Sequence, residues 1–240
     1  MSSLEVALHA IHYRAPRTVA VLTGAGVSAD SGIPTFRGAG GLWREFRPED
    51  LATPEAFRSD PGLVWEWYEW RRGLIRDAKP NAAHEAIARL EDATVITQNV
   101  DGLHTRAGSR DIIELHGNIF RVRCVREGTT TTHEEPFAES PPHCACGALL
   151  RPDVVWFGEA LSNDALAAAA AAVAGADLVL IIGTSGVVYP AAGLASVAKG
   201  LTIEINPEVS DLAPNVRYSI AMRAAEATPQ IVDAILESRS

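Results

Sequence analysis

The sequence has few cysteines, no basic segment and no long apolar run. Its three cysteines cannot form a disulfide framework of the kind that stabilises small secreted domains. A net charge of −9, without basic runs or a basic tail, argues against a nucleic acid or an anionic membrane as a constant partner. The alanine-rich run at 165–174 is too short to span a bilayer, and the first residues lack the charged and apolar regions of a signal peptide. We therefore expect a cytoplasmic protein.

The length of 240 residues suits one sizeable domain with a small inserted module. Strand and helix patterns alternate, which favours an α/β fold with a parallel sheet and helices on both faces. Strands are expected at 18–23, 94–97, 112–115, 177–182 and 202–206, and helices at 4–12, 82–90, 101–107, 163–174, 190–199 and 225–237. Two regions, 38–80 and 121–150, break the alternation, and we expect them to form the smaller module. The Rossmann-like domain would then comprise residues 1–37, 81–120 and 151–240.

A glycine-rich loop follows the first predicted strand. Gly24 and Gly26 allow a sharp turn and a close approach of backbone amides to a pyrophosphate, and Ala29 is small enough for close helix–strand packing. The loop opens a short helix whose N-terminus favours an anion. On its own, however, this glycine pattern also fits an ordinary tight turn. Phe36 and Arg37 follow, so that an aromatic ring and a cation stand beside the same loop.

Polar residues follow other predicted strands, at the edge where open α/β sheets bind ligands. Gln98, Asn99 and Asp101 could hold a ribose and a carboxamide, or could simply cap the next helix. His116 also ends a strand, and its pKa near neutrality suits a general base, although a packed histidine is the ordinary alternative. Two further strand ends are Gly183-Thr184-Ser185 and Asn206-Pro207-Glu208.

The stretch from Gly24 to Gly38 resembles the signature loop of the sirtuins, which are NAD-dependent protein lysine deacylases. The other strand-end segments resemble further sirtuin motifs in the same order, and the likeness extends from residue 18 to residue 230. It implies NAD as the cofactor, with His116 as catalytic base and with Asn99 and Asp101 as catalytic residues at the nicotinamide ribose. The residues that it places against NAD are Gly24, Ala25, Gly26, Ser28, Asp30, Phe36, Arg37, Gln98, Asn99, Asp101, Gly183, Thr184, Ser185, Asn206, Pro207, Glu208 and Ala224.

The resemblance also implies a reaction and a peptide site. The reaction is removal of acyl groups from protein lysine, giving nicotinamide and O-acyl-ADP-ribose; the alternatives are a protein ADP-ribosyltransferase and a non-catalytic module that senses NAD or ADP-ribose. Residues 153–159 could be a buried strand with a turn, but they resemble the sirtuin segment that binds substrate peptide by strand addition. The residues expected to contact the peptide are Val155, Phe157, Gly158 and Glu159.

Tyr68 and Arg71 are candidates for recognising the acyl group of the substrate. They lie three residues apart, so a helix would place them on one face. Spacing alone also fits a core stripe with a surface charge. The pair resembles the Y-x-x-R element of the sirtuin branch that removes succinyl and malonyl groups, in which both side chains bind the acyl carboxylate. A guanidinium can hold a carboxylate bidentately while a phenol adds a third hydrogen bond. We therefore expect activity on succinyl-, malonyl- and acetyl-lysine.

The cysteines depart from the family pattern. Sirtuins carry two cysteine pairs that bind zinc, whereas here Cys124 is followed three residues later by Glu127, and the second pair is Cys144-Ala145-Cys146. Zinc could still bind with Glu127, His133 or His143 as the fourth ligand, because oxygen and imidazole ligands are acceptable. A zinc-free remnant is the alternative. We expect a zinc-ribbon-like module that holds the metal through the three cysteines.

Overall fold

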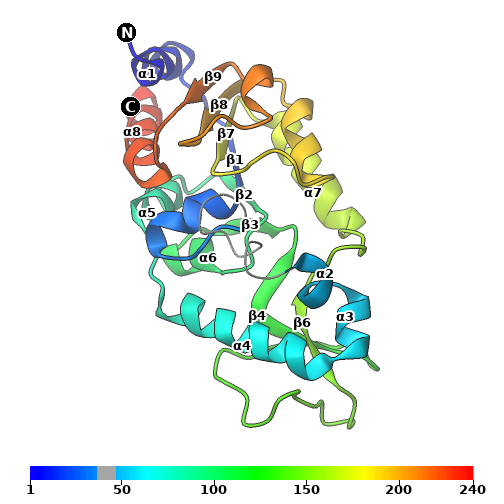
Figure 1. Cartoon of the computed structure of the whole chain (residues 1–240). Coiled ribbons are helices and arrows are strands. Elements are labelled where there is room, and N and C mark those ends of the chain that lie inside the picture. Colours follow the sequence, from blue (N-terminus) through cyan, green and yellow to red (C-terminus); the bar gives the residue numbers. More distant parts are fainter. Residues whose placement is uncertain (37–46, 240) are drawn as a thin grey trace.

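The structure is a computed structural model that describes residues 1–36 and 47–239 (Figure 1). In these residues a six-stranded parallel sheet has the strand order β3-β2-β1-β7-β8-β9. Its strands are β1 (Val19–Thr23), β2 (Thr94–Thr97), β3 (Asp111–Glu114), β7 (Leu178–Ile182), β8 (Leu201–Ile205) and β9 (Tyr218–Ile220). β1 and β7 are buried along their whole length, as expected of parallel strands that helices cover on both faces.

Helices cover the two faces of this sheet and close two separate cores (Figure 1). On one face lie α1 (Ser3–Arg14), α5 (Ala82–Ala88) and α8 (Ala224–Ser238), and on the other lie α7 (Asn163–Gly175) and the 3-10 helix η3 (Ala191–Val197). Side chains alternate along a strand, so Val21 belongs to the first core and its neighbour Leu22 to the second. The remaining short helices of this part are η1 (Ala25–Ser31), α6 (Leu103–Ala107) and η4 (Ala213–Asn215).

A second, antiparallel sheet with the order β5-β4-β6 forms a smaller part, at the bottom of Figure 1. Its strands are β4 (Gly117–Cys124), β5 (Thr130–Thr132) and β6 (Leu150–Val154), and its helices are α2 (Pro48–Leu51), α3 (Pro54–Ser59) and α4 (Pro61–Asp77). Asp60 is the N-cap of α4, and its carboxylate accepts the backbone N–H of Leu63. The buried face of α4 packs Trp65 and Tyr68 into a third core with Ile119.

The predicted α/β fold with a smaller module is confirmed. All five predicted strands form, and β9 is an additional strand of only three residues, too short to give a recognisable pattern. The helix expected at 190–199 is the 3-10 helix η3, and the glycine loop likewise opens a 3-10 helix, η1. β4 begins at Gly117 and β6 ends at Val154, so the small sheet includes residues that the sequence assigned to the larger domain. The division into two domains stays a prediction.

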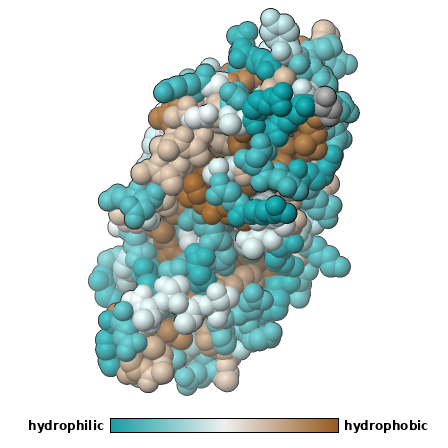
Figure 2. Space-filling view, turned by 180° about the vertical axis from the view of Figure 1, so that it is seen from behind, coloured by the Kyte–Doolittle hydropathy of each residue, from teal (hydrophilic) through white to brown (hydrophobic). Residues whose placement is uncertain are grey.

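No helix within the described ranges is long and apolar enough to cross a membrane. Figure 2 shows the rear face, where hydrophilic side chains cover much of the surface and apolar patches lie between them. Exposed apolar atoms are a normal part of a folded surface, so this mosaic by itself indicates no function.

Candidate active site

A cavity of about 1020 Å³ lies at the carboxyl edge of the parallel sheet, between the sheet and the smaller part. The loops after β1, β2, β7 and β8 form one wall, and α4 with the segment after β6 forms the other. Every residue predicted to contact NAD or substrate lines this cavity, apart from Arg37, which lies outside the described residues. The carboxyl edge of an open α/β sheet is where such folds bind ligands.

Three glycines bring the loops after β1 and β7 into direct contact. The backbone N–H of Gly26 donates to the carbonyl of Gly183 at 2.8 Å. A Cβ on Gly24 would lie 2.8 Å from that carbonyl oxygen, and a Cβ on Gly26 would lie 2.7 Å from the Gly183 Cα. Gly183 itself has a φ of +64°. The glycine pattern is therefore required by loop packing, whether or not a ligand is bound.

A buried polar network stands behind the loop after β2. Ser28 donates its hydroxyl to the Asp101 carboxylate at 2.7 Å, and the Asn99 amide donates to Ser28 Oγ at 3.2 Å and to the Gly24 carbonyl at 3.1 Å. Asp101 also accepts the backbone N–H of Leu103, the first residue of α6, at 2.9 Å, although the N-cap position itself is Gly102. Burial raises the pKa of Asp101, and the bonds from Leu103 and Ser28 oppose that rise. The same carboxylate thus binds the start of α6 and lines the cavity.

His116 is held with one ring nitrogen fixed. Its Nδ1 lies 2.9 Å from the backbone carbonyl of Gln98. A carbonyl can only accept, so Nδ1 carries the proton and Nε2 is the unprotonated nitrogen. Burial lowers the pKa of His116, and the bond to Gln98 opposes this only in part. The ring is therefore neutral near pH 7, which is the form that a general base requires.

Two more histidines lie buried beside the site. His84 accepts the Asn81 N–H at 3.3 Å within the capping box of α5, which gives it a structural role. The His104 ring lies 4.8 Å from that of His84, and its Nε2 is 3.0 Å from the hydroxyl of Thr23. Burial lowers the pKa of His84 to about 4 and the pKa of His104 to about 3. Sequence reasoning did not single out His104, although its place one helical turn beyond Asp101 could have indicated it.

The part of the cavity lined by Thr184 and Asn206 lies close to the start of α8. Asn206 donates its amide to the Thr184 carbonyl at 2.9 Å, and Gln98 donates to the Thr184 hydroxyl at 3.1 Å. Asp30 pairs with Arg223 at 3.1 Å. It therefore holds the start of α8 against η1, in addition to lining the cavity. Arg223 also lines the cavity and was missed, because neither its spacing nor its neighbours mark it in the sequence.

The opposite wall carries Tyr68 and Arg71, both buried on α4. The guanidinium of Arg71 lies over three rings, at 5.0 Å from Phe36, 4.8 Å from Trp67 and 5.9 Å from Tyr68. The Tyr68 oxygen accepts the indole N–H of Trp156 at 2.9 Å. The core stripe of the alternative interpretation is present, because Tyr68 packs in the third core, but Arg71 is buried on the same face of α4 and is not a surface charge.

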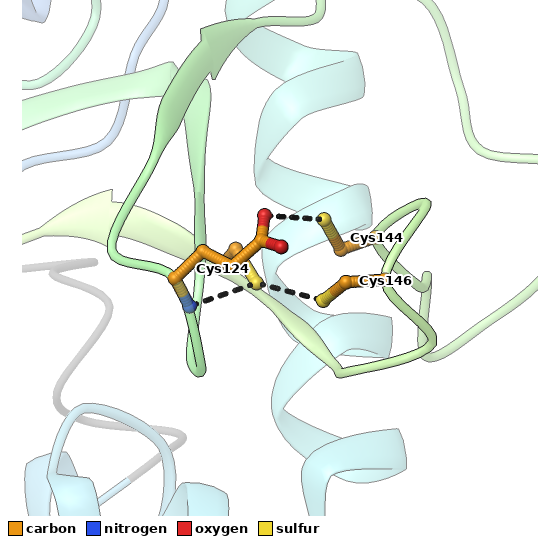
Figure 3. Close-up of side chains that lie close together, drawn as sticks. Cys124, Cys144 and Cys146 are labelled. Carbon is orange, nitrogen blue, oxygen red and sulfur yellow. Dashed lines mark hydrogen bonds between the residues drawn. The ribbon is translucent and has the colours of Figure 1, made fainter.

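The cysteines meet away from this cavity, at the tip of the smaller sheet. Figure 3 shows Cys124 facing Cys144 and Cys146 from a separate segment, with 3.5 Å between the sulfurs of Cys124 and Cys146. Oε2 of Glu127 lies 3.9 Å from the Cys144 sulfur, and the four ligand atoms all lie within 4.8 Å of one another. Among the residues that the structure describes, this is the group with metal-ligand geometry, and its donors suit zinc.

Such a cavity, with fixed polar side chains at the ends of parallel strands, defines an α/β protein that binds a dinucleotide. The model of the Sir2 family matches residues 24–190, and the chain belongs to this family.

Curated relatives and solved structures agree with that assignment. The chain is 52% identical over 227 residues to NAD-dependent protein deacylase 2 of Pyrobaculum aerophilum, covering 91% of each protein. It is 50% identical over 228 residues to the NAD-dependent protein deacylase of Aquifex aeolicus, covering 91% of this chain and 95% of the relative. A crystal structure of a Sir2 homologue with NAD has a TM-score of 0.90 at 46% identity, covering 98% of this chain and 95% of that one.

Proposed function

We propose that this chain uses NAD to remove succinyl and malonyl groups from protein lysine, with acetyl as a weaker or comparable substrate. As a Sir2-family member whose relatives are named NAD-dependent protein deacylases, the chain is an NAD-dependent protein lysine deacylase. The acyl preference is the finer part of the proposal. The observation that carries it is the buried guanidinium of Arg71 on the cavity wall.

Arg71 forms no direct ion pair with a carboxylate among the described residues, although the Asp101 carboxylate across the cavity attracts it electrostatically. It is 7% exposed, and its contacts there are the faces of aromatic rings rather than a carboxylate. Burial lowers the pKa of Arg71, which reflects the cost of placing a cation in this position, although a guanidinium stays charged. Buried charges are ordinarily paired, because desolvation is expensive. A carboxylate at the end of an acyl chain would supply the missing partner.

Tyr68 is arranged to assist Arg71. Its oxygen already accepts a hydrogen bond from Trp156, so its own O–H remains available to donate into the cavity. Burial raises the pKa of Tyr68, which keeps the phenol protonated and therefore a donor. A succinyl or malonyl carboxylate would then receive two guanidinium donors and one phenol. Acetyl-lysine has no such group and would gain nothing from either side chain.

The roles of the remaining site residues follow from their positions. Bound NAD supplies an electrophilic anomeric carbon when nicotinamide leaves. Asn99 and Asp101, held by Ser28, would orient the nicotinamide ribose at the floor of the cavity. His116 would take a proton from a ribose hydroxyl at Nε2, and Phe36 would exclude water from the reacting atoms. Asn206 and Glu208 would hold the adenosine ribose, and acyl-lysine peptides would pair with 155–159 by strand addition.

The test is Arg71→Met, assayed with succinyl-lysine and acetyl-lysine forms of one peptide. We expect most succinyl activity to be lost, on the order of 10²-fold if one charge-assisted pair is removed at about 3 kcal/mol, while acetyl activity is largely spared. Arg76→Met on the same helix is the matched control, because Arg76 does not line the cavity. Equal losses on both peptides would show that Arg71 supports the fold or the NAD site. A peptide that gains the mass of ADP-ribose would favour the transferase alternative.

A further inference from the structure

We propose that Glu127 is the fourth ligand of a zinc centre with three cysteine thiolates, and that this carboxylate makes the centre release its metal more readily than four thiolates would. The proposal is independent of the acyl preference, because none of the four residues lines the active-site cavity. It concerns the one position at which this chain departs from the two cysteine pairs that sirtuins resembling it carry.

Two tight turns present the ligands to each other. At the end of β4, Gly128 donates its N–H to the Cys124 carbonyl at 2.9 Å, and Glu127 donates its backbone N–H to the Cys124 sulfur at 3.4 Å. Just before β6, Gly147 donates to the Cys144 carbonyl at 2.8 Å. Gly128 and Gly147 both have positive φ, at +69° and +81°, which closes each turn. Each turn therefore directs two ligand positions toward the other turn.

Two of the separations between ligand atoms are close to the edges of a zinc tetrahedron, and all four atoms lie within 4.8 Å of one another. With zinc–sulfur bonds of about 2.3 Å and zinc–oxygen bonds of about 2.1 Å, two sulfurs lie about 3.8 Å apart and a sulfur and an oxygen about 3.6 Å apart. The Cys124–Cys146 sulfurs are separated by 3.5 Å, and Glu127 Oε2 lies 3.9 Å from the Cys144 sulfur. Both values lie close to the expected edges. Figure 3 shows the sulfurs of Cys124, Cys144 and Cys146 turned toward a common centre.

The two histidines that the sequence also offered as a fourth ligand lie outside the converging group. His133 stacks on Phe137, with ring centroids 4.0 Å apart, and His143 pairs with Glu139 at 3.4 Å. Neither belongs to the group whose ligand atoms converge. Glu127 occupies the place that the second cysteine of a C-x-x-C turn would take, and its carboxylate keeps the total ligand charge at that of four thiolates.

The carboxylate changes how firmly the metal is held. Thiolates are soft ligands that favour zinc, whereas a carboxylate oxygen suits harder cations. Glu127 is exposed and Cys144 and Cys146 are partly exposed, so a chelator can approach the oxygen side of the site. Replacing one thiolate by this oxygen should therefore weaken zinc binding and speed its release, without abolishing the site.

The test measures metal directly, in the full-length protein purified with zinc. We expect about one zinc per chain, and after exchange a cobalt(II) spectrum whose sulfur-to-metal charge-transfer intensity rises by about one third in Glu127→Cys, as three thiolates become four. A colorimetric chelator should remove zinc on the order of tenfold more slowly from Glu127→Cys and tenfold faster from Glu127→Gln. Glu134→Gln, a change of an exposed carboxylate in the same module, is the control and should match the parent protein.

Three results would overturn the proposal. One is parent protein that takes up neither zinc nor cobalt although it is folded by circular dichroism. Another is a Glu127→Gln variant whose cobalt spectrum and release rate equal those of the parent, which would place the fourth ligand elsewhere. If the variants fail to fold, the parent's own cobalt spectrum decides, because an intensity typical of two or four thiolates contradicts three.

Discussion

His116 is the residue whose removal should separate chemistry from binding. Its ring lines the cavity, and its Nδ1 is fixed by the Gln98 carbonyl at 2.9 Å, so Nε2 is the free base. His116→Ala deletes that base and leaves the Ser28–Asp101–Asn99 network without a lost partner. General-base contributions are typically about 10²–10⁴-fold, so kcat should fall by that amount while the dissociation constant for NAD changes little.

The structure also sets the pH at which His116 acts. The base form is the neutral ring, and burial lowers the pKa of His116 below its usual 6.5. In the parent enzyme kcat/KM should therefore be level through neutral pH and fall only on acidification below about 6.5. An unshifted histidine would begin to lose activity at higher pH. The acidic limb should be absent from the residual activity of His116→Ala.

The assay is deacylation of a succinyl-lysine peptide, with NAD binding followed separately by calorimetry. His143→Ala is the matched control, because His143 lies on the surface of the smaller part, outside the cavity. Near-full deacylation by His116→Ala would refute the assignment of the base. A loss of NAD affinity as large as the loss of kcat would instead make His116 a binding residue.

The remaining predictions concern stability. The pKa values of His84 and His104, about 4 and about 3, lie below the unfolded value, so the free energy of unfolding should fall as the pH drops below 6.5. The loss should be at most about 1.4 kcal/mol per pH unit per histidine. Urea unfolding between pH 7 and pH 4.5 measures this slope, and a flat profile would contradict the prediction. Gly183→Ala would place a Cβ 2.3 Å from the Val27 nitrogen at a φ of +64°, so we expect a loss of about 2–5 kcal/mol in denaturant unfolding. Gly73→Ala, inside α4 and with open space around it, should instead stabilise by about 0.5–1 kcal/mol, and a loss of equal size in both variants would refute the packing argument.

Local signals were sufficient for the elements that present the site. Apolar runs predicted β1 and β7, and polar residues at strand ends predicted the edge at which Asn99 and His116 now lie together. Strand ends can be recognised locally because the period of hydrophobicity stops there. The predicted contact residues that follow strands line one cavity for that reason, whereas Tyr68 and Arg71 reach it from α4.

What the sequence could not supply are contacts between distant segments. The ion pair of Asp30 with Arg223 joins η1 to the start of α8, and no local sequence pattern predicts it. The role of Gly24 and Gly26 in packing against Gly183 depends on β1 and β7 being neighbours, which only the sheet order reveals. The choice of Glu127 over two histidines likewise depends on how the turn after β4 meets the one before β6. In each case the chemistry was visible in the residue type, but its partner was not.

The most direct measurement is a reaction of the parent enzyme with NAD and one peptide in succinyl-, malonyl- and acetyl-lysine forms, read by mass spectrometry. We predict loss of the acyl mass, release of one nicotinamide per turnover and formation of the matching O-acyl-ADP-ribose. Succinyl and malonyl peptides should turn over at least as fast as the acetyl peptide. Acetyl turnover alone would contradict the role of Arg71, and no acyl loss from any peptide would contradict NAD-dependent deacylation itself.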